Sequence, residues 1–169
     1  IQGPGAAVLA VSGNDASRVF YLYNENALID VTISSLTVTD GSSSIGGGIV
    51  DFDENLTLDG VVITNNAASS DGGGLWADGF YMTLTVRNST ISGNAAGGGG
   101  GVYVEDTEGV TTFDSVVVDG NTATRQGGGI FLYDPDADVV IDDSTVTGNT
   151  AAKGGGIYLY SQDGGSVTI

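Results

Sequence analysis

The sequence predicts an all-β chain folded as a parallel β-helix, with three short strands and about 27 residues in each of nearly six coils. Three observations predict it: a glycine triplet recurs at nearly constant spacing, an asparagine recurs with it, and apolar residues alternate in short runs between them. A period of this length is typical of solenoids. Each repeat is too small to bury its own apolar face, so neighbouring repeats must stack.

The glycine triplet and the asparagine define one register. Gly-Gly-Gly is followed by an aliphatic residue five times, at Ile49, Leu75, Val102, Ile130 and Ile157. An asparagine lies eight or nine residues before each of the last four, and alanine follows two residues after it. These asparagines are Asn66, Asn94, Asn121 and Asn149. We expect them to turn inward at a tight corner and to form a structural ladder, in which each amide bonds the backbone and the next asparagine.

Three strands are expected in each coil. The first strand covers residues 31–33, 56–58, 84–86, 111–113, 139–141 and 167–169. The second strand ends at Val38, Ile63, Ile91, Val118 and Val146, and the third follows the glycines. Alternation places Val31 and Ile33 inside and Thr32 outside. Glycine in the corners permits positive φ and a close approach of neighbouring coils.

The motif in which Gly-Asn-Thr-Ala precedes Gly-Gly-Gly-Ile, at residues 120–130 and 148–157, carries a resemblance to a known family. It resembles the repeats of right-handed parallel β-helix proteins of bacterial and archaeal surfaces. It looks like the GGA(I/L/V) repeats of polymorphic outer-membrane-protein passenger domains, with Gly where that family has Ala. The resemblance covers nearly the whole chain and implies an extracellular, often adhesive setting. It also implies a right-handed coil, which agrees with the handedness of parallel crossover connections.

Composition excludes several functions. The 169 residues contain no Cys and no His, so disulfides, zinc fingers and Ser-His-Asp triads are unavailable. Four bases against 21 acids give a formal net charge of -17, which excludes nucleic acid as a partner. No apolar run approaches the length of a membrane span, so membrane insertion is not expected. We expect a single β-helix domain over residues 1–169, either as a segment of a longer rod or as a filament subunit.

The segment is not expected to be an enzyme. Asp142 and Asp143 could suggest the paired carboxylates of inverting glycosidases. Asp142, however, falls at a corner where other coils carry Asp59, Arg87 and Asp114. Polygalacturonase-like sites also need a histidine and a cluster of bases, which the chain lacks. A polysaccharide-degrading enzyme of the β-helix class is therefore the third hypothesis.

One outward column of the third strand is expected to be rich in aromatic residues. It comprises Tyr23, Val50, Trp76, Tyr103, Phe131 and Tyr158. Aromatic faces stack on sugars and on other proteins, so this column is a candidate ligand or partner surface. The alternative is a self-stacking ladder that stiffens the sheet and packs beneath the long loops.

Acids concentrate between the third strand of one coil and the first strand of the next, along one expected edge of the rod. The candidate calcium ligands are Asp51, Asp53, Glu54, Glu105, Asp106, Glu108, Asp134, Asp136 and Asp138. Calcium takes six to eight oxygens from such clusters. The alternative is a solvated acidic edge that keeps the protein soluble. Calcium is the only candidate cofactor that the sequence suggests.

The leading functional hypothesis is an extracellular or cell-surface structural or adhesive solenoid, as part of an adhesin, a stalk or a head-to-tail filament. Its expected partners are further copies of the chain, associated end to end, or a continuation of the same chain. A surface glycan and a host or cell-surface protein are the other candidate partners. The alternative is a carbohydrate-binding module that uses the aromatic column. Asn55 and Asn88 match the N-glycosylation pattern and are candidate modification sites.

Overall fold

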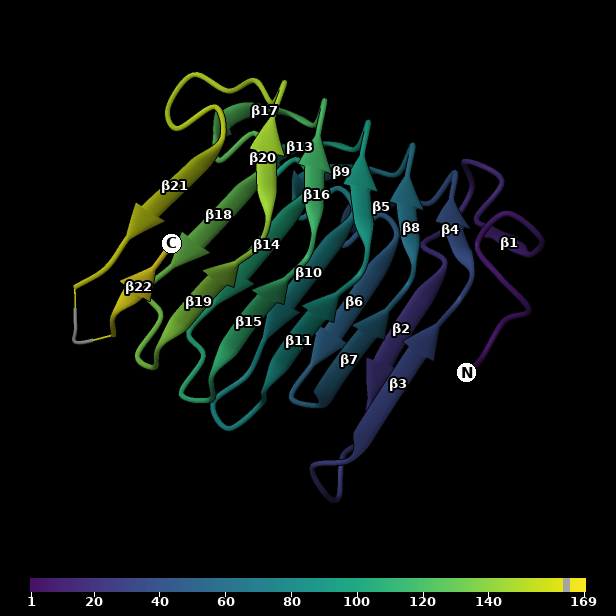
Figure 1. Ribbon diagram of the computed structural model, residues 1–169, viewed down its shortest axis with the longest axis horizontal. Helices are drawn as coiled ribbons and strands as arrows, with labels where there is room; N and C mark the ends of the chain where they lie inside the picture. The colour runs from purple at the N-terminus through teal and green to yellow at the C-terminus, as the bar shows by residue number, and fades with distance from the viewer. Residues whose placement is uncertain (163–164) are drawn as a thin grey trace.

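The computed structural model describes residues 1–162 and 165–169 as a β-solenoid of about six turns (Figure 1). All its strand pairs are parallel and join consecutive coils, and the described residues contain no helix. The all-β class, the parallel stacking and the 27-residue period predicted from the sequence are therefore confirmed. The coil path crosses four sheets, which we name A, B, D and C in the order the chain meets them.

Three sheets have six strands each. Sheet A contains β3 (Asp30–Ser34), β7 (Asn55–Asp59), β11 (Leu84–Arg87), β15 (Thr111–Asp114), β19 (Val139–Asp142) and β22 (Val167–Thr168). Sheet B contains β1 (Ala10–Ser12), β4 (Thr37–Thr39), β8 (Val62–Thr64), β12 (Thr90–Ser92), β16 (Val117–Asp119) and β20 (Thr145–Thr147). Sheet C contains β2 (Phe20–Tyr23), β6 (Ile49–Phe52), β10 (Leu75–Asp78), β14 (Val102–Glu105), β18 (Ile130–Tyr133) and β21 (Ile157–Tyr160).

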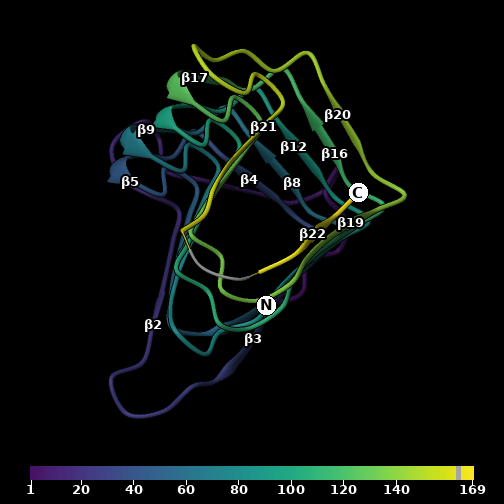
Figure 2. The ribbon, with the colours of Figure 1, turned by 90° about the vertical axis from the view of Figure 1, so that its left-hand side faces the viewer.

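A fourth strand per coil corrects the prediction of three. Sheet D contains β5 (Ser42–Ile45), β9 (Ala67–Asp71), β13 (Ala95–Gly98) and β17 (Thr122–Gln126). Its strands follow the asparagine corner, and the sheet projects beside sheet C, away from the body that sheets A, B and C enclose (Figure 2). Ala, Ser, Thr and Gly dominate this segment, so it lacks the large apolar residues that mark a strand in sequence.

At each corner between two sheets the chain turns at a single residue with positive φ, and this residue recurs at the equivalent point of successive coils. The sets are Ser35, Gly60, Asn88, Ser115 and Asp143 between sheets A and B; Asp40, Asn65, Gly93, Gly120 and Gly148 between B and D; Gly46, Gly72, Gly99, Gly127 and Gly154 between D and C; and Asp53, Asp106 and Asp134 between C and A. Gly, Asn and Asp tolerate the left-handed region best. Each coil therefore turns at the same points and stays in register with its neighbours.

The interior holds an apolar core that runs along the axis. Inward residues stack with their equivalents in the next coil, as Leu58, Val86 and Phe113 do in sheet A, and all three are fully buried. Removing such side chains from water supplies the main favourable free energy of folding.

A continuous asparagine ladder runs through the corner between sheets B and D. The Oδ1 atom of Asn94 accepts the Nδ2–H of Asn66 at 3.0 Å and the backbone N–H of Asn66 at 2.9 Å. The same pair of bonds joins Asn94 to Asn121 and Asn121 to Asn149. Each asparagine also donates an Nδ2–H to a sheet B carbonyl, for example Asn121 to Ile91. The buried amides are thus satisfied.

The last glycine of each triplet makes room for this ladder. A Cβ placed on Gly101 would lie 2.6 Å from the carbonyl oxygen of Gly129 and 3.1 Å from the Asn121 side chain. Gly74 and Gly129 stand in the same relation to Asn94 and Asn149. The glycine triplet and the asparagine, which are separate motifs in the sequence, therefore pack against each other in the structure.

Candidate functional site

The central part of the aromatic column of sheet C is buried, which contradicts its interpretation as an exposed binding surface and agrees with the alternative of a packed ladder. Strand register aligns Tyr21, Val50, Trp76, Tyr103, Phe131 and Tyr158. Trp76, Tyr103 and Phe131 are each only 7 % exposed. Tyr23 was also placed wrongly: it aligns with Phe52, one column further, and Tyr21 takes the expected position.

Sheet D is the reason for this burial. A Cβ on Gly72 would lie 2.6 Å from the Trp76 Cβ, and one on Gly98 would lie 3.1 Å from the Phe131 ring. Sheet D and the glycines after it therefore lie over the column and form a second apolar cluster outside the main core. Arg125 extends across Gly97 to an ion pair with Asp71 at 2.8 Å. In the coils that contain Trp76, Tyr103 and Phe131, the column packs against sheet D and offers little surface to a ligand.

A second column on the same outer face mixes aromatic and acidic residues. It comprises Tyr23, Phe52, Asp78, Glu105, Tyr133 and Tyr160. The rings stack with their neighbours: Phe52 lies 6.1 Å from Trp76, and Tyr133 lies 5.2 Å from Tyr160, between ring centroids. These side chains are partly or well exposed, so this column is the part of sheet C that solvent reaches.

Asp78 and Glu105 face each other across adjacent strands at the centre of that column. Partial burial raises the pKa of Asp78 to about 6 and that of Glu105 to about 7. Nearby carboxylates add to both shifts, chiefly Asp106 for Asp78 and Asp78 for Glu105. The pair therefore changes its charge near neutral pH.

The acidic edge arises mainly from the corner between sheets C and A. Asp53, Asp106 and Asp134 occupy the positive-φ position in three coils, which gives these aspartates a conformational reason to be there. Glu108, Asp136 and Asp138 are exposed in the adjoining loops. In the described residues, no group of three or more acids comes close enough to hold a metal ion.

Two of the predicted edge residues lie inside the solenoid instead. Asp51 and Glu54 are both 0 % exposed, and Asp51 shares the inward column of Ala77 and Val104. Burial raises the pKa of Asp51 to about 8, with further increases from Glu54 and Asp53. The prediction that these two residues belong to an exposed edge is therefore wrong, because strand alternation after Ile49 directs Asp51 inward.

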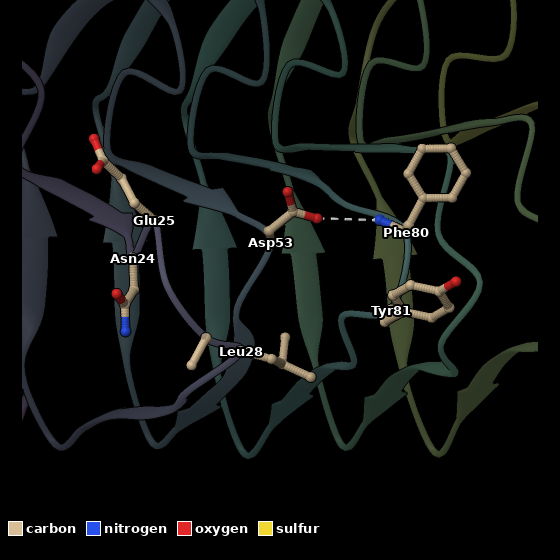
Figure 3. Close-up of a pocket in the computed structure, with 7 residues that line it drawn as sticks. Asn24, Glu25, Leu28, Asp53, Phe80 and Tyr81 are labelled. Carbon is tan, nitrogen blue, oxygen red and sulfur yellow. Dashed lines mark hydrogen bonds between the residues drawn. The ribbon is translucent and has the colours of Figure 1, made fainter.

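A pocket of about 510 Å³ lies beside the acidic edge near the second and third coils (Figure 3). Its lining comes from the loops of three coils: Asn24, Glu25, Ala27, Leu28, Asp53, Phe80 and Tyr81. Phe80 and Tyr81 are 61 % and 74 % exposed, and their ring centroids lie 6.5 Å apart. Asp53 accepts the Phe80 backbone N–H through Oδ1 at 3.2 Å. No position of the repeat marks this site in the sequence, because Phe80 and Tyr81 lie outside the repeat.

The two glycosylation candidates differ in their surroundings. Asn55 is partly buried and is engaged on both sides: its Nδ2–H bonds Asp30, and its Oδ1 accepts from Thr83. Asn88 is exposed, at a positive-φ corner, and donates to Asp59. Asp142 and Asp143 lie exposed at the same corner between sheets A and B.

These features define a β-solenoid whose repeated residues serve the coil itself. The chain belongs to the right-handed β-helix family: the family model described as "Right handed beta helix region" matches residues 8–169. This family includes both enzymes and non-enzymes. No curated protein and no solved structure matches the chain. No helix in its described part has the length and apolar character needed to cross a membrane.

Proposed function

We propose that the chain is a structural and adhesive segment of an extracellular or cell-surface protein, in the manner of the passenger repeats it resembles. The observation that carries the proposal is the asparagine ladder, which continues without a break from Asn66 to Asn149. A ladder of this kind stabilises the contact between successive coils and adds no chemistry. The net charge of -17 supports the proposal, since it favours a solvated rod.

Force spectroscopy tests the structural role. The chain has no cysteine, so Asn26→Cys and Lys153→Cys introduce two unique attachment points in the first and last coils. Because each coil contacts chiefly its neighbours, we expect resistance to extension and then steps of about one coil. A chain that lengthens smoothly at low force would contradict the structural role. Antibody labelling of intact, unpermeabilised source cells tests the proposed location, and labelling only after permeabilisation would contradict it.

Carbohydrate binding is a second candidate, and the pocket favours it. Phe80 and Tyr81 present exposed rings that can stack on sugars, beside polar groups from Asp53, Glu25 and Asn24 that can bond hydroxyls. The buried Trp76 column no longer supports this function.

A glycan array compares the parent chain with Phe80→Ala/Tyr81→Ala and with a control, Tyr160→Ala, which removes a partly exposed ring outside the pocket. Binding lost only in the double variant would support the candidate. An array without signal from the folded parent, or equal signal from the parent and the double variant, would exclude the pocket as a glycan site.

A further inference from the structure

Asp51 is a buried acid whose carboxyl oxygens make no well-formed hydrogen bond. Its side chain points into the solenoid from β6 and is 0 % exposed. The backbone N–H of Glu54 is near enough to offset part of the rise in the Asp51 pKa, but it does not bond either oxygen in good geometry. The residue above it in the next coil is Ala77, where later coils carry Val104 and Leu132. Ala77 is smaller than the residues that later coils carry in this column.

Glu54 brings a second carboxyl group into the same region. It is also 0 % exposed, and it is one of the charged groups that raise the Asp51 pKa. Its Oε2 accepts the backbone N–H of Ile29 at 2.8 Å, which fixes the side chain, whereas Oε1 is buried without a partner. Three buried carboxyl oxygens of two residues therefore lack a well-formed hydrogen bond from the protein.

None of the four bases is shown to supply the missing charge. Arg87 pairs with Asp59 and Arg125 pairs with Asp71, and these are the ion pairs of the described residues. Arg18 bonds Ser43 and the carbonyl of Ile45. Lys153 pairs with Gln126 and precedes β21, which three strands separate from β6 in sheet C. Buried carboxylates are normally paired or bound to a metal, so the two acids need a cation or protons.

We propose that Asp51 and Glu54 bind one calcium ion inside the second coil. Calcium suits these residues because it accepts carboxylate oxygens together with backbone carbonyls in irregular geometry. Magnesium suits them less, because it needs near-ideal octahedral geometry and keeps several waters, and a fully buried position has little room for waters. The ion offsets the charge of both acids and joins sheet C to the start of sheet A.

Calcium titration against a matched variant tests the site. The first variant is Asp51→Asn/Glu54→Gln, and the control is Asp78→Asn/Glu105→Gln, which removes two carboxylates from the surface of sheet C. We expect calcium to raise the melting temperature of the parent and of the control until the site saturates. The first variant should lose this shift. In chelator it should melt above the parent, because its buried amides carry no charge.

Terbium luminescence provides a readout that does not need the variant to fold. Trp76 is the only tryptophan, and it lies next to Ala77, the strand partner of Asp51. We expect terbium bound to the parent to emit on tryptophan excitation, and calcium to displace it. A parent without sensitised emission and without a calcium-dependent shift would overturn the proposal, and would show that the two acids hold protons. An equal calcium shift in the parent and in the first variant would also overturn it.

Discussion

Asn94 gives both its backbone N–H and its side-chain Nδ2–H to a single oxygen, Oδ1 of Asn121, each at 3.0 Å. One amide oxygen thus satisfies two donors of the coil below. Because Asn66 and Asn94 repeat this relation, the ladder converts a corner full of polar groups into a bonded column inside the protein.

Truncating one member of the ladder should destabilise the chain strongly. Asn121→Ala removes the acceptor of two buried donors on Asn94 and one bond to the Ile91 carbonyl. Unpaired buried groups of this kind cost about 2–5 kcal/mol in total. Chemical denaturation measures the loss. Asn26→Ala, at an exposed loop position, is the control and should change stability by less than about 0.5 kcal/mol.

Two glycines separate the effect of space from that of backbone conformation. Gly101→Ala places a methyl group 2.6 Å from a carbonyl oxygen of the next coil, so it should cost more than about 3 kcal/mol or prevent folding. Gly120→Ala meets nothing within 4 Å and carries only the strain of its φ of +64°, about 1–2 kcal/mol. Thermal melts of the two variants compare them, and equal losses would contradict the close approach at Gly101.

The buried aromatic column should respond as core does. Trp76→Ala opens a cavity beneath sheet D and should cost about 3–5 kcal/mol. Tyr81→Ala, in the exposed pocket, should leave stability within about 0.5 kcal/mol of the parent. Denaturant midpoints measure both. If Trp76→Ala unfolds at the parent's midpoint, sheet D does not cover the column.

Stability in chelator should fall as pH rises. The folded-state pKa values of Asp78, Glu105 and Asp51 are about 6, about 7 and about 8, above the ordinary values of 3.8, 4.5 and 3.8. The folded chain therefore binds more protons than the unfolded chain between about pH 4 and about pH 8, so its stability is greatest at the acid end. Denaturation across this range measures the slope. Asp51→Asn should flatten its upper part, and a parent that becomes more stable toward pH 8 would contradict the assignment.

The repeat was visible in the sequence because its residues have strict geometric tasks. Glycine at the positive-φ corners and asparagine beside it cannot be exchanged freely, so both mark every coil from Asn66 onward. Sheet D was missed because it is formed by small residues, which do not mark a strand in the sequence. The position of this sheet over Trp76 could therefore not be predicted. The aromatic column was placed on the correct side of sheet C, and of its two predicted environments the packed ladder agrees with the buried cluster of Trp76, Tyr103 and Phe131.

The candidate sites depend on departures from the repeat, which periodicity describes poorly. Strand alternation counted from Ile49 directs Asp51 into the solenoid. The acidic residues that follow it, up to Glu54, instead suggested an exposed loop. The pocket needs loops of three coils to meet around Asp53, and a single coil's sequence contains no signal for that meeting. The residues that the backbone geometry requires in every coil could therefore be predicted from the sequence, whereas the pocket could not.

Hydrogen exchange of the asparagine side chains measures whether an internal amide ladder holds the solenoid together. Nuclear magnetic resonance follows the Nδ2 protons of Asn66, Asn94 and Asn121 beside those of the exposed Asn26. We expect the three ladder amides to exchange as slowly as the core strand amides around them, because both open only with the coil. Exchange of the ladder amides at the rate of Asn26 would contradict it.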